Sequence, residues 1–264
     1  MSIHAKLKPA RQNHSIKEAS ISVFLQNPIV NPKDFGTLIE TDFKGKFQRF
    51  EVQDHVSVSL NVGSGRNIAT QTEIEEDKGF QFTSFDAKGR TEKIIRGCNE
   101  LDRTYVSYHS LNYERWLPFM DSYKENMSVI SRQQDLFTIA FGLHYLDEFY
   151  WTEKNTDIEP RMIFNNTNDY LPAHFFKSSN TIFVMVTENE DCIDRLEIKI
   201  TSKLSIPIVS ISHNVIASQD QAKKLNELID SSDFSEALNL AHERNKNLLK
   251  QILQPSISEL IKLT

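Results

Sequence analysis

Residues 50–62 read FEVQDHVSVSLNV, and this stretch decides the fold class. In its second half valine or leucine stands at every second position, and two serines and an asparagine stand between them. A period of two is that of a strand with one buried and one solvated face. Strands of this kind belong to antiparallel sheets, so the sequence predicts a long antiparallel strand here.

Similar alternation predicts further strands on both sides of this stretch. The predicted strands lie at residues 18–25, 80–82, 94–95, 104–108, 137–145, 182–186, 196–200 and 206–217. Asp86-Ala87-Lys88-Gly89 is predicted as a hairpin turn, because glycine adopts a positive φ without steric cost. Residues 63–78 are polar and acidic and predict a loop, and residues 150–178 are predicted as irregular.

Two long amphipathic helices are predicted from apolar residues spaced three and four apart. The first covers residues 112–130, and the second covers residues 234–252 and ends before Pro255. Pro32 predicts a short helix through Leu38, because proline is tolerated in a first helical turn. Ser218 and Gln221 form a capping box that predicts another short helix.

The element order predicts an α+β protein with two similar halves, each a curved antiparallel sheet packed on a long helix. The halves are residues 18–131 and 132–264, which can join into one continuous domain, and their likeness suggests an internal duplication. Residues 1–17 are basic up to the first acid, Glu18, and predict a flexible tail because chain ends are usually disordered.

Composition narrows the class of protein. The 264 residues include 17 phenylalanines, which predicts a substantial core. The net charge of −6 disfavours nucleic acid as the main partner, since binding to phosphates needs a positive field. Cys98 and Cys192 are isolated, so neither a zinc site nor any cofactor is expected, and they suit a reducing compartment. No long apolar run predicts a membrane span, and a cytoplasmic location is expected.

Several aromatic motifs carry a family resemblance. They are Phe82-Thr83-Ser84-Phe85-Asp86, Tyr105-Val106-Ser107-Tyr108, the aromatic helix start from Tyr113 to Phe119, and Leu143-His144-Tyr145-Leu146-Asp147. Together they resemble a sporadically distributed bacterial family of about this length, over most of residues 18–254. His144 stands where that family usually has arginine.

The resemblance implies a layout but no reaction, because the family has none assigned. Its patchy distribution is similar to that of genes on mobile elements, which include phage-defence and toxin–antitoxin modules. The resemblance therefore implies a role in such a module by association alone.

His144, Asp147 and Glu148 lie together at a strand end and are the candidate catalytic residues. A histidine beside carboxylates can do acid–base work or hold a metal. On a strand His144 and Glu148 share a face and Asp147 points the other way. The alternative interpretation, an exposed polar strand end, is favoured.

Tyr108, Tyr113 and Trp116 are the candidate binding residues, with Phe119 beside them. Such a cluster can form a stacking platform for a ligand or a hot spot for a partner. The alternative, which is favoured, is packing of the first long helix on its sheet.

Four weaker patterns are interpreted as structural. Arg103 and His109 have a ribonuclease-like spacing, but they lie on a predicted strand rather than a helix. His242 is predicted at the rim of the core on the last long helix, and no motif for serine catalysis accompanies it. The loop at 63–66 lacks the rest of a P-loop, and the acidic turn at 188–191 lacks the rest of a calcium loop. These residues are Arg103, His109, Gly63-Ser64-Gly65-Arg66, Glu188-Asn189-Glu190-Asp191 and His242-Glu243-Arg244-Asn245.

Two functions remain open. The first is a non-enzymatic binding or regulatory protein that holds a protein partner or a small ligand, with an accessory or antitoxin-like role in a defence module as its sharpest form. The second is a metal-independent hydrolase or nuclease that acts through the region around His144. The absence of a catalytic motif favours the first.

Overall fold

The computed structural model describes residues 6–12, 14–62, 68–153, 156–177, 180–189, 192–203 and 206–263. The described strands are β1 (Leu7–Pro9), β2 (Ile16–Leu25), β3 (Arg49–Val62), β4 (Ile68–Phe85), β5 (Thr91–Asn99), β6 (Thr104–Ser110), β7 (Phe137–Trp151), β8 (Thr181–Glu188), β9 (Cys192–Lys203) and β10 (Ile206–Lys224). The described helices are α1 (Pro32–Phe43), α2 (Trp116–Ser131), α3 (Pro160–Ile163), η2 (Phe175–Lys177), α4 (Leu225–Asp230), α5 (Ser232–Ile252) and α6 (Pro255–Leu260).

The described strands form one ten-stranded sheet in which every pairing is antiparallel. Its order is β3-β4-β5-β6-β2-β7-β10-β9-β8, and β1 pairs with the end of β7. Strands β2 and β7, which are the first strands of the two predicted halves, therefore pair with each other in the middle of the sheet. This pairing makes the sheet continuous across residue 131, and the predicted α+β class with an antiparallel sheet is confirmed.

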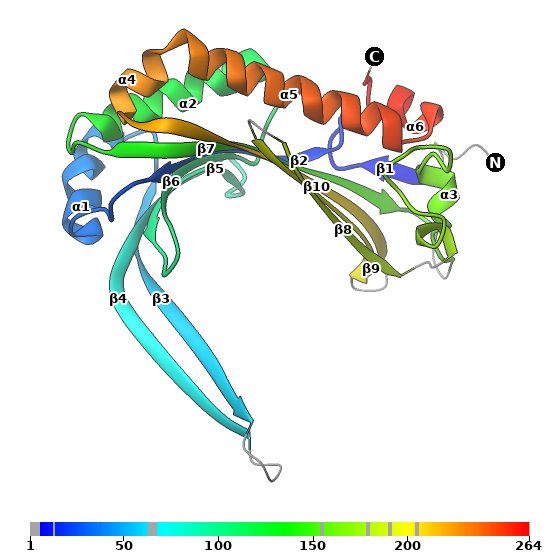
Figure 1. Ribbon diagram of the computed structural model, residues 1–264, viewed down its shortest axis with the longest axis horizontal. Coiled ribbons are helices and arrows are strands. Elements are labelled where there is room, and N and C mark those ends of the chain that lie inside the picture. The colour runs from blue at the N-terminus through cyan, green and yellow to red at the C-terminus, as the bar shows by residue number, and fades with distance from the viewer. Residues whose placement is uncertain are drawn as a thin grey trace.

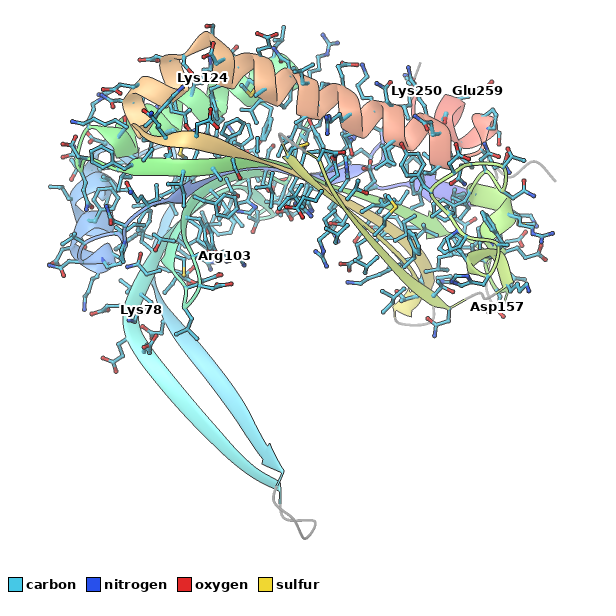
Figure 2. The ribbon with its side chains drawn as sticks, viewed as in Figure 1. Lys78, Arg103, Lys124, Asp157, Lys250 and Glu259 are labelled. Carbon is cyan, nitrogen blue, oxygen red and sulfur yellow. The ribbon has the colours of Figure 1, made fainter. Side chains whose placement is uncertain are left out.

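The sheet is arched, and the helices lie on one side of it (Figure 1). We call the helix-covered side the outer face and the opposite side the inner face. The β3–β4 hairpin extends beyond the sheet as an arm, and β8, β9 and the start of β10 descend at the other end of the arch. Charged side chains such as Lys250 and Glu259 project from the helices away from the sheet (Figure 2).

Two hydrophobic cores lie between the outer face and the helices. The first joins β2, β6 and β7 to α1, α2 and the start of α5. The second joins β7, β9 and β10 to α3, α6 and the end of α5. Helix α5 thus contributes Phe234 and Leu238 to one core and Leu248 and Ile252 to the other, so the cores do not divide at residue 131.

Most predicted elements occur close to their predicted bounds. The strand at Phe50 begins at Arg49 and reaches Val62, and the helix predicted at 112–130 covers Trp116–Ser131, with Pro118 in its first turn. The turn at Asp86 also occurs, and Gly89 there has a φ of 75°. The helix opened by Pro32 runs to Phe43, five residues beyond the predicted end.

The loop predicted at 63–78 is wrong for residues 68–78, because β4 begins at Ile68. Residues 68–75 pair with β3 in the arm, and residues 76–78 lie at a break in that register. Residues 68–78 lack the alternation that marks their partner residues 56–62 of β3, so only the pairing identifies them as part of a strand. Residues 63–67, with the Gly63-Ser64-Gly65-Arg66 motif, lie outside the described residues.

The short helix predicted at Ser218 is also wrong. Strand β10 continues to Lys224 and pairs again with β7 after a break in register between Ser218 and Lys223. The polar residues that suggested a capping box lie in this irregular part of the strand, where Gln219 donates to the Thr138 hydroxyl at 3.1 Å.

The described part of the predicted flexible tail is ordered by pairing with β7. Leu7–Pro9 forms β1, and Lys6 donates to Glu153 at 3.0 Å. Residues 1–5 and 13 lie outside the described part. Among the described helices, none has the length and apolar character required to cross a membrane.

Candidate functional site

The inner face carries a row of polar side chains across the central strands. Residues directly opposite one another in an antiparallel sheet point to the same face. Ser20 on β2 lies opposite both His109 on β6 and His144 on β7. The row continues outward to neighbouring strands at both ends; its members are Glu18, Ser20, Gln81, Arg96, Ser107, His109, His144, Ser212 and Asn214.

Glu18, His109 and Ser107 form a chain of hydrogen bonds at the centre of the row. His109 Nδ1 lies 2.7 Å from Glu18 Oε1, and His109 Nε2 lies 2.8 Å from Ser107 Oγ. The hydrogen bond from His109 holds the pKa of Glu18 below its ordinary value, although burial acts in the opposite direction. The carboxylate orients the imidazole, which in turn contacts a hydroxyl.

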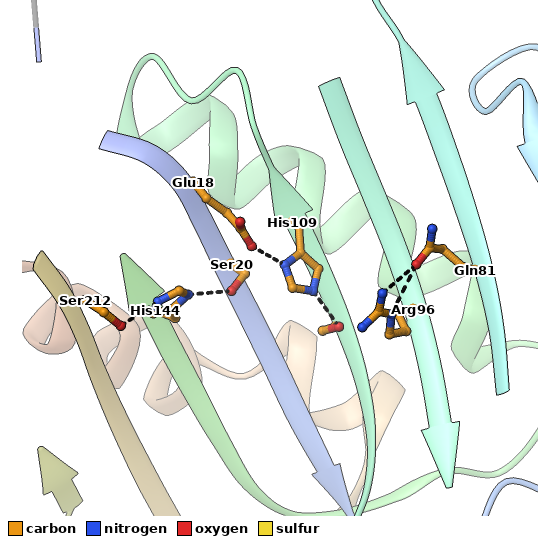
Figure 3. A network of polar contacts seen from close by, with 8 residues as sticks. Glu18, Ser20, Gln81, Arg96, His109, His144 and Ser212 are labelled. Atoms are coloured by element: carbon orange, nitrogen blue, oxygen red, sulfur yellow. Dashed lines mark hydrogen bonds and ion pairs between the residues drawn. The ribbon is translucent and has the colours of Figure 1, made fainter. Parts of the chain in front are cut away.

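His144 occupies the next position in the row. Its Nε2 lies 3.1 Å from Ser212 Oγ on β10, and its Nδ1 lies 3.5 Å from Ser20 Oγ on β2 (Figure 3). Burial lowers the pKa of His144, and the nearby Glu18 partly offsets that effect. Burial thus disfavours the charged imidazolium, and the neutral ring offers both a donor and an acceptor to the two serines.

Arg96 and Gln81 continue the row on β5 and β4. The Arg96 guanidinium donates to Gln81 Oε1 through Nε at 3.1 Å and Nη2 at 2.8 Å (Figure 3). Arg96 lies directly opposite Ser107. A cation thus stands beside the hydroxyl end of the Glu18–His109–Ser107 chain.

The structure separates the three predicted catalytic residues. Asp147 lies on the outer face, where Ser15 Oγ donates to its Oδ1 at 2.6 Å. Glu148 accepts from Lys17 at 2.8 Å and from Tyr150 at 2.7 Å. Among the described residues His144 makes no hydrogen bond to Asp147 or Glu148, and each of the three has other partners. The predicted division of faces, with Asp147 opposite to His144, is confirmed by the alternation along β7.

Burial raises the pKa of Asp147 to about 6, against the effect of the Ser15 hydrogen bond. Its Oδ2 is buried and has no hydrogen-bond partner among the described residues. Because Asp147 faces the core, its unusual pKa reflects desolvation rather than a place at an open site.

Tyr108 lies on the outer face of β6, Tyr113 lies in the segment before α2, and Trp116 is the first residue of α2. Tyr108 Oη lies 2.7 Å from the Ser122 hydroxyl of α2. Tyr113 packs edge-on against Tyr145 at a ring distance of 5.8 Å. Tyr108 and Tyr113 are buried in the first core, which is the packing arrangement that the sequence favoured.

Trp116 has a different neighbour. Its ring stacks on the His242 ring at 4.6 Å with an interplanar angle of 3°. His242 Nδ1 lies 2.8 Å from Tyr145 Oη. Burial lowers the pKa of His242 to about 4. These contacts join α2, α5 and β7, so they account for His242 as a residue at the rim of the core.

A second polar cluster lines a cavity of about 340 Å³ between α5 and the strands β8 to β10. Asp194 accepts from Arg244 at 2.8 Å and lies 3.4 Å from His213 Nε2. His213 Nδ1 lies 3.1 Å from Asn245 Oδ1. The hydrogen bonds of Asp194 tie the helix to the sheet, which gives this cluster a structural role.

The other predicted sites are not assembled by the fold. Arg103 pairs with Glu100 at 2.7 Å in the turn before β6, apart from the partners of His109. Residues 190 and 191 of the acidic turn lie outside the described residues. Both cysteines are free, and burial raises the pKa of each thiol. Among the described residues no group of three or more His, Cys, Asp or Glu side chains could hold a metal ion.

Sequence reasoning found His144 but missed its neighbours. Ser20 and Ser212 come from two other strands, and only the pairing of those strands with β7 brings them to His144. These serines are visible in the sequence as the polar residues of alternating strands. They could not be placed beside His144 without the strand order.

No protein-family model, curated protein or solved structure matches this chain.

Proposed function

We propose that this protein is a non-enzymatic binding or regulatory protein, and that its inner sheet face receives a protein partner. The observation that carries the proposal is the polar row on a face that no described helix covers (Figures 1 and 3). The arm and the β8–β10 end flank this face and give it a concave form. An open, concave sheet face with aligned donors and acceptors suits a polar macromolecular surface.

The charges of this face favour a protein over a nucleic acid. Most of its cations lie beside carboxylates: Arg195 lies 2.6 Å from Glu197, which Lys199 also contacts, and Arg49 lies 3.1 Å from Glu51. His109 is likewise paired with Glu18. Arg96 is the exception, since it donates to the uncharged Gln81. A face on which most cations are paired with carboxylates gains little of the counterion release that drives binding to phosphates.

The family resemblance supports a further step. If the resemblance holds, the partner belongs to a mobile defence or toxin–antitoxin module, and this chain is its accessory or antitoxin-like component. The strand orders β2-β6-β5-β4-β3 and β7-β10-β9-β8 run outward from the centre in the same way. This similarity supports an origin of the two halves by duplication.

The binding proposal is tested by capture from the native host with two tryptophan variants. Ser212→Trp places a large ring on the inner face, and Leu240→Trp places the same ring at an exposed position of α5. We expect one partner to be retained by wild type and by Leu240→Trp and lost by Ser212→Trp. A partner that Ser212→Trp retains in full would place the interface elsewhere.

A second candidate function, hydrolysis of an ester, is favoured by the Glu18–His109–Ser107 chain. The two distances match those of a serine nucleophile, its base and an orienting carboxylate. Ser107 Oγ would attack the carbonyl carbon, His109 would take the hydroxyl proton and return it to the leaving alcohol, and water would then release the acid. Arg96, directly opposite Ser107 in the sheet, would be the cation beside the developing oxyanion.

Two features place this candidate second. Ser107 is only 1% exposed. It also lies in a strand paired on both sides, whose amides are engaged in the sheet rather than in an oxyanion hole.

A fluorophosphonate probe decides between the candidates, because it reacts with activated serines. Hydrolysis predicts labelling of wild type and of Ser22→Ala, the serine directly opposite Ser107, and no labelling of Ser107→Ala. Unlabelled wild type contradicts the hydrolase and leaves the binding proposal standing.

A further inference from the structure

Strand β8 forms one edge of the sheet. It pairs with β9 along its length, and no other described strand pairs with its second side. An edge strand offers backbone donors and acceptors to any strand that approaches it. Figure 1 shows β8 at the margin of the sheet, away from the arm.

The edge carries a row of exposed apolar side chains. Ile182 is 64% exposed, Val184 47% and Val186 60%. They lie opposite Lys199, Glu197 and Arg195 of β9 and so share one face. Three β-branched side chains at alternate positions make a continuous apolar strip along the edge.

Edges that remain unpaired usually carry charges, proline or a bulge. Residues 182–187 contain no charge and no proline, and their pairing with β9 has no break in register. The opposite edge of the sheet, β3, differs in this respect, since its described side chains include Arg49, Glu51 and Asp54. Residues 182–187 of β8 therefore lack the charged side chains seen on β3.

The other face of β8 is apolar as well. Phe183 and Met185 pack partly buried against the second core. A strand added to this edge would therefore find apolar neighbours on both faces.

We propose that β8 pairs antiparallel with β8 of a second copy of this chain, across a two-fold axis at Val184. In this register Val184 meets its own counterpart, Ile182 meets Val186, and Phe183 meets Met185. Cross-strand pairs of β-branched and aromatic side chains stabilise a sheet, and a two-fold dimer is the commonest closed assembly.

The distribution of charge along β8 favours a second copy of the chain as the partner and favours this register. The strip is uncharged, so two copies meet without like charges opposite each other, which would destabilise the pair. Glu188 at the end of the strand lies opposite Asn180 in this register. A shift that centres the axis on Met185 places Ile182 opposite Glu188 and loses one apolar pair at each end.

Sedimentation of the purified chain tests the proposal. Wild type is expected to show twice the mass of one chain, with dissociation on dilution. Val184→Lys and Val184→Glu place two like charges at the axis, and each is expected to sediment as a single chain with an unchanged circular dichroism spectrum. Leu101→Lys, at a position 81% exposed in the turn after β5, is the control and is expected to dimerise like wild type.

Mixing the two variants gives the sharpest outcome. Lysine and glutamate then face each other across the axis, and the dimer is expected to return. Wild type that sediments as a single chain at every concentration overturns the proposal and leaves the edge to a strand of another protein. Full dimerisation of Val184→Lys, or a mixture that stays monomeric, overturns the pairing through Val184.

Discussion

The two faces of β7 differ although they share one backbone. On the outer face Leu143 and Tyr145 are buried in the first core under the helices. On the inner face His144, between them in sequence, contacts Ser20 and Ser212. Packing against helices explains the outer face, whereas no described element covers the inner one. Because packing of the core does not require the polar residues of the inner face, we expect a partner to bind there.

The carboxylates of the two faces differ in the same way. Burial raises the pKa of Asp147 on the outer face to about 6. The hydrogen bond from His109 lowers the pKa of Glu18 on the inner face. The charged form of Asp147 is destabilised and the charged form of Glu18 is stabilised. Ionisation of these two carboxyls therefore changes the stability of the fold in opposite directions.

The largest expected difference in stability is between substitutions at Ile21, on the outer face of β2, and at its neighbour Ser20, on the inner face. Ile21 is fully buried in the first core, so Ile21→Ala is expected to lower the free energy of unfolding by about 2–5 kcal/mol. Ser20→Ala removes a long contact to His144 and is expected to cost about 1 kcal/mol or less. Urea denaturation measures both. Equal losses would break the comparison, because the inner face would then contribute to stability like the core.

The next effect comes from Asp147→Asn. The folded pKa is raised, so the stability that the neutral carboxyl contributes is full below pH 3.8 and is lost as pH rises through about 6. Asparagine stays neutral and avoids this loss, which amounts to about 3 kcal/mol at most at about 1.4 kcal/mol per pKa unit. We expect the variant to be more stable than wild type at pH 8 and to gain much less at pH 4.5, as measured by urea denaturation. A gain of equal size at both values would contradict the assignment.

The smallest effect is expected from Glu18→Gln. The folded pKa is lowered, so the stability that the charged group contributes is present above pH 4.5 and is lost as pH falls through the folded value. Since the pair with His109 is partly exposed, the expected cost at pH 7 is about 1 kcal/mol or less. The same denaturation series should show the cost disappearing toward acid pH. A cost that grows toward acid would reverse the assigned sign.

The fold was predictable wherever apolar residues recur with the period of a strand or of a helix. The alternation in β7 predicted a strand and placed Asp147 opposite to His144, because burial of Leu143 and Tyr145 imposes that period. The helix from Trp116 was predicted for a similar reason. The prediction failed at Ile68–Lys78, where the arm pairs only with itself, and around Ser218, where the register breaks.

The candidate site was predictable only in part. His144 was found because it stands beside two acids in sequence, yet those acids have other partners. Its neighbours Ser20 and Ser212 are polar residues of ordinary alternating strands. Their nearness depends on strand order, which a local pattern does not contain.

Helix α5 has a consequence for how the chain folds. It spans both cores, with Phe234 in one and Ile252 in the other. Loosening either end of this helix exposes apolar surface in the core it leaves and removes the anchor of the other. We therefore expect a single cooperative unfolding transition, and a fragment cut after residue 131 would lack β7 and α5, which complete its own core.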